Sequence, residues 1–586
     1  MTSVDELFKK PGLPSGNLKR KLEVPDAAHT WKSSKLSASS SPNGSGANGA
    51  SVEDAPEDDD DVEAGPELPP EDEGEGEQGD RFFGGGVTKS SAAALDYLDQ
   101  QDDEEVAEEK IDSAWLRRLT NSFEKKVSKN AEQRARYENE PEKFMASEAD
   151  VDAEIKSWSL VSEHPALYAE FAASEAPGMI VGLLAHENTD IAISAIEIIS
   201  ELLDEDVAAE PEDWDAVARA FLEADLLELL MSNLARLDEN EESDRSGVYY
   251  SLSVLESLAS QQSLAERIGT QKVLEWLCNR LQKAENSVSQ NKQYAAEVLQ
   301  VLLQSSPLLR KRLAVDVDGV DLFLQLLSAY RKRDPEKDST EEEYAENLFD
   351  SLTCVVDESE GKGKFIEAEG IELALIMLKE GDFSKSRALC LLDHACGGQG
   401  AAVTEVCEKL VDAAGLKTLF KMFVKKNDSA TTEHLLGIFA SLLRLLRGES
   451  ASRIRTLAKF NEKDYEKVDK LLQLRTDYAR RLSAVDAQIR SERSALPAEE
   501  AKERDDEWFS RRLDGGLFVL RTIDVTLAWL VAEDAEAKKR ILGSVRVAEI
   551  AQSLQEQLEG LEPAAGDEGE DADTREMLET LIECLK

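Results

Sequence analysis

Apolar side chains recur at the three- and four-residue spacing of amphipathic helices along most of this chain. Between Gly178 and Leu446 a short apolar helix, a polar break and a longer apolar helix follow one another six times. Successive units begin 46, 46, 49, 51 and 45 residues apart. Their first residues are Gly178, Ala224, Thr270, Gly319, Gly370 and Gly415. Because one such set of helices cannot bury its apolar face alone, the recurrence predicts stacked units.

A period of about 40 to 47 residues with two or three helices per unit is typical of armadillo and HEAT repeats. We therefore predict an all-α, armadillo- or HEAT-like superhelical solenoid, with about six repeats over residues 178–447. Residues 81–177 contain a docking segment followed by helices with apolar residues at helical spacing. We expect these helices to cap the first repeat, whose core would otherwise be exposed.

The remaining segments differ from the repeats. Residues 1–80 are rich in Ser, Gly, Pro, Asp and Glu and predict a disordered arm. Residues 448–514 predict a long helical insert, residues 515–562 a last helical unit, and residues 563–586 an acidic tail with a short helix. The insert carries one apolar stripe, formed by Leu471, Leu474, Tyr478, Leu482, Val485 and Ile489. Such a stripe favours core or a helix-packing seam, with self-association into a homo-oligomer or docking of a partner as the alternative.

The chain is strongly acidic, with 120 Asp and Glu against 68 Lys and Arg and a net charge of −52. Residues 1–110 contain 27 acidic and 10 basic residues, or −17, so residues 111–586 carry −35. An acidic array repels the phosphate backbone, and we expect no direct nucleic-acid binding. Basic protein segments are the partners that such a surface favours.

The arm contains a basic segment that predicts a nuclear localisation signal of bipartite spacing, recognised by an importin. A solvated basic patch is the alternative interpretation. The signal would place the protein in the nucleus. Its basic residues are Lys19, Arg20, Lys21, Lys32 and Lys35.

No pattern in the chain is typical of catalysis, so we expect neither enzyme activity nor a cofactor. Cys390, His394, Cys396 and Cys407 lie close in sequence but lack the CxxC spacing of a metal site. Buried thiols are the favoured interpretation. The six scattered cysteines, the polar N-terminus and the lack of a long apolar run indicate an intracellular protein without a membrane span.

The last helix of each unit is expected to line a concave groove suited to an extended peptide. In the first unit Ile196, Ile199 and Leu202 should face inward, which leaves Glu197 and Glu201 towards the groove. By the same pattern, the candidate basic-peptide groove also includes Ser253, Glu256, Ser257 and Asp350. Importins, which are also armadillo proteins, hold basic peptides there with Trp and Asn, which the first two units lack. Ordinary surface charge is the alternative for these carboxylates.

Several unusual strings closely resemble the beta-catenin-like protein 1 family, in order from about residue 81 to residue 550. They are RFFGGGVTK with ALDYLD (81–99), FEKKVSKN (123–130), EPEKFMASE (140–148), LLAHENTDIAI (183–193), ENLFDSL (346–352) and RRLDGGLFVL (511–520).

This resemblance implies a nuclear armadillo protein associated with the spliceosome, especially the nineteen complex. Relatives bind nuclear-localisation-like basic segments of splicing factors, including the Myb-domain subunit of that complex. The function expected is therefore a non-catalytic adaptor in pre-mRNA splicing. The alternative is an importin-like transport adaptor for basic cargo, against which the missing Trp and Asn residues argue.

Overall fold

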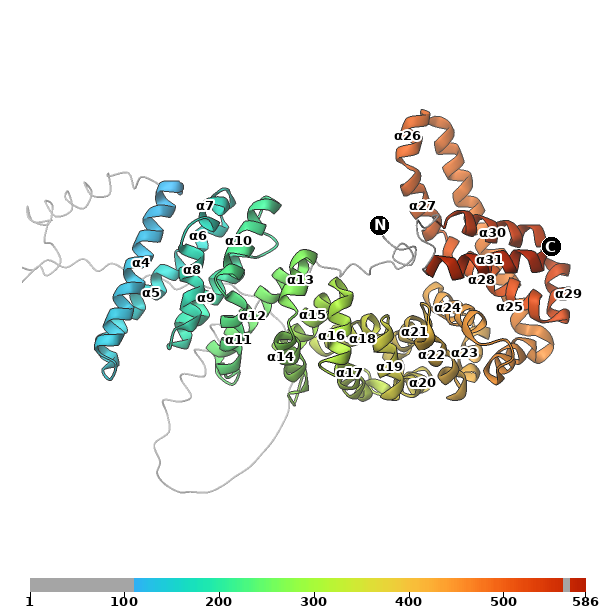
Figure 1. The fold of residues 1–586 in the computed structure, drawn as a ribbon, viewed down its shortest axis with the longest axis horizontal. Helices are drawn as coiled ribbons and strands as arrows, with labels where there is room; N and C mark the ends of the chain where they lie inside the picture. The colour runs from blue at the N-terminus through green and yellow to red at the C-terminus, as the bar shows by residue number, and fades with distance from the viewer. Residues whose placement is uncertain (1–109, 562–569) are drawn as a thin grey trace, which may run out of the picture. The chain divides into compact units, whose positions relative to one another are not determined.

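The computed structural model describes residues 110–561 and 570–586, which form helices without any strand (Figure 1). The predicted nuclear signal at Lys19 to Lys35, the disordered arm and the docking segment before residue 110 lie outside the described residues. Within the described ranges no single helix is long and apolar enough to cross a bilayer. Only the pair Asp505–Asp514 and Leu517–Glu533, bent by 64°, passes that test together.

Short helices precede the repeats and cover the first of them. Helices α5 (Met145–Lys156) and α6 (Ser159–Ser162) pack against α9 (Thr189–Leu202), and α7 (Tyr168–Ala172) packs against α10 (Pro211–Glu223). A chain of aromatic contacts passes through this region, with ring centroids 5.6 Å apart for Phe123 and Trp158 and 5.9 Å for Phe171 and Phe221. The elements are α4 (Ser113–Arg136), η1 (Pro141–Lys143), α5 (Met145–Lys156), α6 (Ser159–Ser162), η2 (Pro165–Leu167) and α7 (Tyr168–Ala172).

The six predicted units form the armadillo-like array. The first contains α8 (Ala176–Gly182), η3 (Leu183–Ala185) and α9 (Thr189–Leu202). Each later unit has three main helices. They are α10 (Pro211–Glu223), α11 (Leu226–Arg236) and α12 (Glu242–Ser260); α13 (Gln262–Ile268), α14 (Gln271–Gln282) and α15 (Gln290–Ser305); α16 (Pro307–Val315), α17 (Gly319–Leu327) with η4 (Ser328–Arg331), and α18 (Thr340–Val355); α19 (Ser359–Glu367), α20 (Gly370–Glu380) and α21 (Phe383–Cys396); and α22 (Ala401–Asp412), α23 (Gly415–Val424) and α24 (Ser429–Leu445).

The last helices of the units stack directly on one another. Helix α9 packs on α12, α12 on α15, α15 on α18, α18 on α21 and α21 on α24. We call these six helices the third-helix row. Because each buries an apolar face against both neighbours, the row connects all six units.

The glycines at the start of several units have a steric role. The turn between the first and second helices puts Asp318, Glu369 or Ala414 in the left-handed region, with φ near 60°. The next residue is glycine, and a Cβ on Gly370 would lie 2.2 Å from the Phe365 ring. These glycines therefore let the second helix begin directly against the first.

Helix packing continues beyond Leu446. Helix α25 (Ala451–Ala495) is interrupted at Glu462–Tyr465, and its first part places Phe460 against Phe420 at 4.8 Å between ring centroids. This first part of the predicted insert thus belongs to the packed core. Helix α28 (Leu517–Glu533) then stacks on α24. The remaining helices are α26 (Ala498–Glu503), α27 (Asp505–Asp514), α29 (Ala535–Ser544), α30 (Val547–Glu559) and α31 (Glu570–Leu585).

The apolar stripe of the insert is a packing seam. Its members Leu471, Tyr478, Leu482 and Ile489 are buried. A Cβ on Gly516 would lie 2.4 Å from the Tyr478 ring, so α28 begins in close contact with the seam. Farther along α25, a small separate apolar cluster of Ile489, Ala501 and Trp508 joins α25 to α26 and α27.

Candidate peptide-binding surface

The predicted register of the third helices is correct in the first two units. Ile196, Ile199 and Leu202 are fully buried, while Glu197 and Glu201 are half-buried on the other side of α9. Leu252, Leu255 and Leu258 of α12 are likewise buried. Ser253, Glu256 and Ser257 are partly exposed.

Glu197 bridges two stacked helices. Its Oε1 accepts a hydrogen bond of 2.6 Å from the Tyr250 hydroxyl of α12. A neutral hydroxyl leaves the negative charge of Glu197 in place. Within the described ranges Glu197 forms no ion pair, although Lys156, which pairs with Asp152, interacts with it electrostatically. The Glu197 side chain is therefore held in position by a neutral donor.

Glu201 lies in a more enclosed and more acidic environment. Burial raises the pKa of Glu201; a hydrogen bond with Ser159 acts in the opposite direction, and Glu197, Asp204 and Glu163 raise it further. Its Oε2 atom is buried and has no hydrogen-bond partner in the described part of the chain. A cation placed beside Glu197 and Glu201 would satisfy that atom and relieve the repulsion between carboxylates.

The candidates on α12 repeat part of this arrangement. Ser253 accepts a hydrogen bond of 2.9 Å from Ser200 of α9, and Glu256 accepts one of 2.5 Å from the Tyr294 hydroxyl of α15. Ser257 is partly exposed beside them. Glu197 on α9 and Glu256 on α12 are therefore each held by a tyrosine from the next third helix.

Asp350 lies in a different charge environment on α18. Its side chain remains accessible, yet partial desolvation by surrounding atoms raises its pKa, as does Glu346. Arg387 and His394 act in the opposite direction. Arg387 of α21 also forms an ion pair with Glu346. Asp350 lies on α18, three units after the α9 carboxylates. Unlike them, it has cationic neighbours that offset its charge.

The tyrosines that orient the glutamates have no signature in the local sequence. Tyr250 is 53 residues from Glu197, and Tyr294 is 38 residues from Glu256. Their pairing depends on the offset between stacked helices, which no local pattern specifies. The absence of the importin-type tryptophans extends to the whole row, because none of the six third helices contains Trp.

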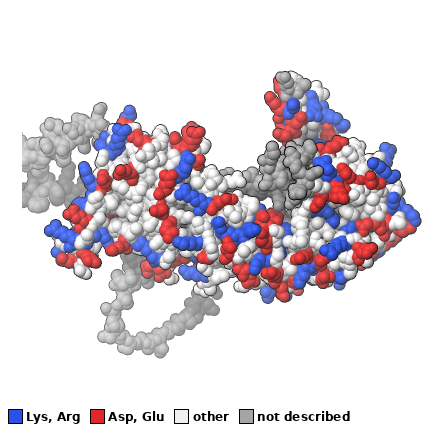
Figure 2. Space-filling view, in the orientation of Figure 1, with Lys and Arg blue, Asp and Glu red and all other residues white. Residues whose placement is uncertain are grey.

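Charge on the described surface is mixed. Figure 2 shows Lys and Arg interspersed with Asp and Glu over the helices on one face. The acidic excess is therefore not gathered into one continuous patch on that face. The local environment of Glu197 and Glu201 is more informative than net charge.

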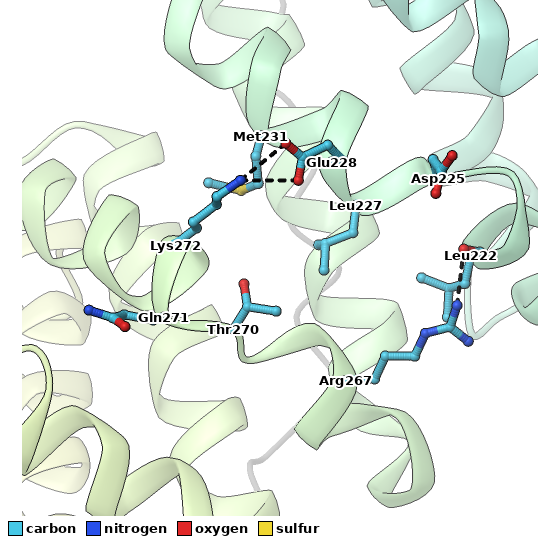
Figure 3. A pocket seen from close by; sticks show the side chains of 9 residues that line it. All are labelled: Leu222, Asp225, Leu227, Glu228, Met231, Arg267, Thr270, Gln271 and Lys272. Carbon is cyan, nitrogen blue, oxygen red and sulfur yellow. Dashed lines mark hydrogen bonds and ion pairs between the residues drawn. The ribbon is translucent and has the colours of Figure 1, made fainter.

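A pocket of about 430 Å³ lies between the first two helices of neighbouring units, away from the predicted residues (Figure 3). Lys272 forms an ion pair of 3.1 Å with Glu228 at its edge, and Arg267 donates to the Leu222 carbonyl at 3.0 Å. Both cations thus have partners in the protein. The pocket contains none of the candidate groove residues.

The cysteines near the end of the array divide into two groups. Cys396 and Cys407 are buried and hydrogen-bonded to each other. Cys390 is partly exposed and contacts two histidines. The described residues contain no group of side chains with metal-binding geometry.

Comparison with known proteins gives a consistent result. Residues 92–559 match the family described as catenin-beta-like, Arm-motif containing nuclear. The beta-catenin-like protein 1 homolog of Schizosaccharomyces pombe is 36% identical over 493 residues, covering 83% of this chain and 86% of that protein. Human beta-catenin-like protein 1 is 36% identical over 432 residues, covering 71% and 76%.

Among solved structures, an engineered protein aligns with 75% of this chain and 95% of its own, at 17% identity and a TM-score of 0.47. The matched family spans the capping helices, all six units and helices α25 to α30. The chain belongs to the catenin-beta-like family of Arm-motif-containing nuclear proteins.

Proposed function

We propose that this protein is a non-catalytic nuclear adaptor in pre-mRNA splicing, associated with the nineteen complex. It binds nuclear-localisation-like basic segments of splicing factors, including the Myb-domain subunit, through the third-helix row. The arm's basic segment is recognised by an importin for nuclear entry. Family membership supports the armadillo scaffold and the nuclear location.

The observation that carries the peptide-binding proposal is the pair Glu197 and Glu201. Both are partly accessible, and neither forms an ion pair within the described residues. Lys156, which pairs with Asp152, is the described cation that also acts electrostatically on Glu197. One oxygen of Glu201 is buried without a hydrogen-bond partner there. Lys and Arg side chains donate strong hydrogen bonds to such carboxylates.

The specific test measures binding of a fluorescent basic peptide, with the sequence of a splicing-factor nuclear signal, to the full-length protein. The double variant Glu197→Gln and Glu201→Gln should raise the Kd about tenfold, since it removes two charge-assisted interactions. Binding to the unmodified protein should also weaken with ionic strength.

The matched control is Glu212→Gln with Glu223→Gln, which changes net charge equally on exposed positions of α10. It should leave the Kd within about twofold, because distant surface charges are screened. Tyr250→Phe separates orientation from charge, since it removes only the hydrogen bond to Glu197. If both pairs of Gln substitutions weaken peptide binding equally, or if neither weakens it, the assignment of the site is wrong.

A further inference from the structure

Five polar side chains meet where the end of α18 and helices α21 and α24 pack together, apart from Glu197 and Glu201. They are Asp357, Cys390, Asp393, His394 and His434. We call them the Cys390 cluster. The Cys390 thiol is its nucleophilic member and is partly exposed.

Two imidazoles flank the thiol, and a carboxylate orients each of them. His394 Nδ1 lies 3.0 Å from Asp357 Oδ1, and His434 Nδ1 lies 3.0 Å from Asp393 Oδ2. Both rings also hydrogen-bond to Cys390. Because Nδ1 of each ring faces a carboxylate, Nε2 is the atom available for the sulfur. This carboxylate–imidazole–thiol order is the arrangement that activates cysteine nucleophiles.

The surrounding structure holds these groups in place. A Cβ at Gly437 would lie 2.3 Å from Asp393 Oδ1, so glycine leaves room for the carboxylate that orients His434. Lys362 is buried and donates to the main-chain carbonyls of Asp357 and His394, each at 3.2 Å. It thereby joins the carboxyl-terminal ends of α18 and α21.

The electrostatics favour the thiolate. Burial alone would raise the pKa of Cys390, but hydrogen bonds with His394 and His434 lower it to about 7. Burial would lower the histidine pKa values, but their bonds to carboxylates and to Cys390 raise both to about 10. Besides the two carboxylates of the cluster, Asp350 acts on His394 and Asp428 acts on His434. Lys362 lies at the main-chain carbonyls of Asp357 and His394.

We propose that Cys390 is a thiol-modification site for small disulfides such as oxidised glutathione. The Cys390 thiolate attacks one sulfur of the small disulfide, the original S–S bond breaks, and a mixed disulfide forms. The leaving thiolate takes a proton from a flanking imidazolium. One disulfide is consumed and one formed, so the exchange needs no other oxidant.

The arrangement also predicts how much faster Cys390 should form a mixed disulfide than an ordinary thiol. At about pH 6 the thiolate fraction of a cysteine with a pKa of about 7 exceeds that of one at 9.0 by roughly two orders of magnitude. The lower basicity of the thiolate costs about one order in nucleophilicity. We therefore expect a net rate advantage of about tenfold over a thiol of ordinary pKa.

The test treats the full-length protein with oxidised glutathione across a range of pH and measures each mixed disulfide by mass spectrometry. Cys390 should be modified first, with a rate that rises through an inflection near pH 7. Cys584, which is exposed, is the internal reference. His434→Gln should slow Cys390 about tenfold, move its inflection upward and leave Cys584 unchanged.

Gly437→Ala provides a second variant should His434→Gln disturb folding, because it displaces Asp393 without changing a titratable group. Gly437→Ala should also slow the formation of the mixed disulfide at Cys390. Iodoacetamide labelling checks thiolate character separately. If Cys390 and Cys584 react at equal rates, or if iodoacetamide labels Cys390 rapidly while oxidised glutathione does not, the proposal is wrong.

Discussion

At the residue scale, the carboxylates that bond to neighbouring helices differ in how their charge is balanced. Glu197 is held by a neutral tyrosine, whereas Asp393 is paired with His434 and Asp524 with Arg475. A neutral donor fixes a carboxylate without cancelling its charge, while a cationic donor does both. The first arrangement suits recognition of basic ligands, and the others stabilise local packing.

Asp524 and Arg475 form a buried ion pair that should control stability at mildly acidic pH. Their Oδ1 and Nε atoms are 2.6 Å apart, and Asp524 is fully buried. Burial raises the pKa of Asp524 to about 6, and Arg475 offsets only part of this effect. The pKa of Asp524 is higher in the folded state than in the unfolded state. Asp524 therefore contributes most to the free energy of unfolding below about pH 4, and this contribution falls as the pH rises to about 6.

Between about pH 4 and pH 6 the free energy of unfolding is expected to fall by about 3 kcal/mol through Asp524. Urea unfolding of the intact protein and of Asp524→Asn at both pH values measures it, because the variant should lack this component. Arg475→Leu should cost about 3–5 kcal/mol near neutral pH by leaving an unpaired buried charge. The double variant Arg475→Leu and Asp524→Leu should recover most of that loss. Additive losses would contradict the pairing.

At the element scale, the turn between the first and second helices sets how closely the helices of a unit pack. Glu369 adopts φ of 57°, and Gly370 then begins α20 against Phe365. Equivalent glycines at 319 and 415 face Leu313 and Leu410. The spacing of glycines that marks the repeats in the sequence therefore reflects a packing requirement.

Two glycines seven residues apart make this requirement testable. Gly370→Ala should destabilise the protein by about 1–3 kcal/mol, because its Cβ would overlap the Phe365 ring. Gly363→Ala, inside α19 with no atom within 4 Å of the new Cβ, should stabilise it by about 0.5–1 kcal/mol. Thermal unfolding of both variants measures the difference. If both variants change the unfolding temperature in the same direction and by a similar amount, helix propensity determines their stability, and the contact with Phe365 does not.

At the scale of the whole molecule, the described helices are stabilised mainly by contacts between neighbours in the stack. The third-helix row links the six units, and α28 continues it after α24. The outer part of α25 with α26 and α27 depends instead on its own small apolar cluster. Such a segment can open without unfolding the rest.

Trp508→Ala should therefore act locally. It removes the largest side chain of the small cluster and a hydrogen bond of 3.2 Å to Glu492. Hydrogen exchange should increase within residues 485–511 and stay unchanged in α9, α12 and α15. Affinity for the basic peptide should also be unchanged. Faster exchange throughout the six units would show that this segment stabilises the entire stack.

The sequence by itself determined the all-α class, the six units and the inward register of the third helices. These follow from apolar periodicity and from glycines at the turns, which are local properties. The apolar pattern did not predict that the first part of α25 belongs to the core, because Phe460 packs against Phe420, a residue of the preceding unit.

Only the tertiary structure decided how polar groups pair between helices. Tyr250 with Glu197, and His434 with Asp393 beside Cys390, come from different units, about 40 to 50 residues apart. Their contacts depend on the rotation and offset of stacked helices, which apolar spacing does not specify. Thus the sequence identified Glu197 and Glu201 as candidates, but their environment could be described only after the helices had been placed together.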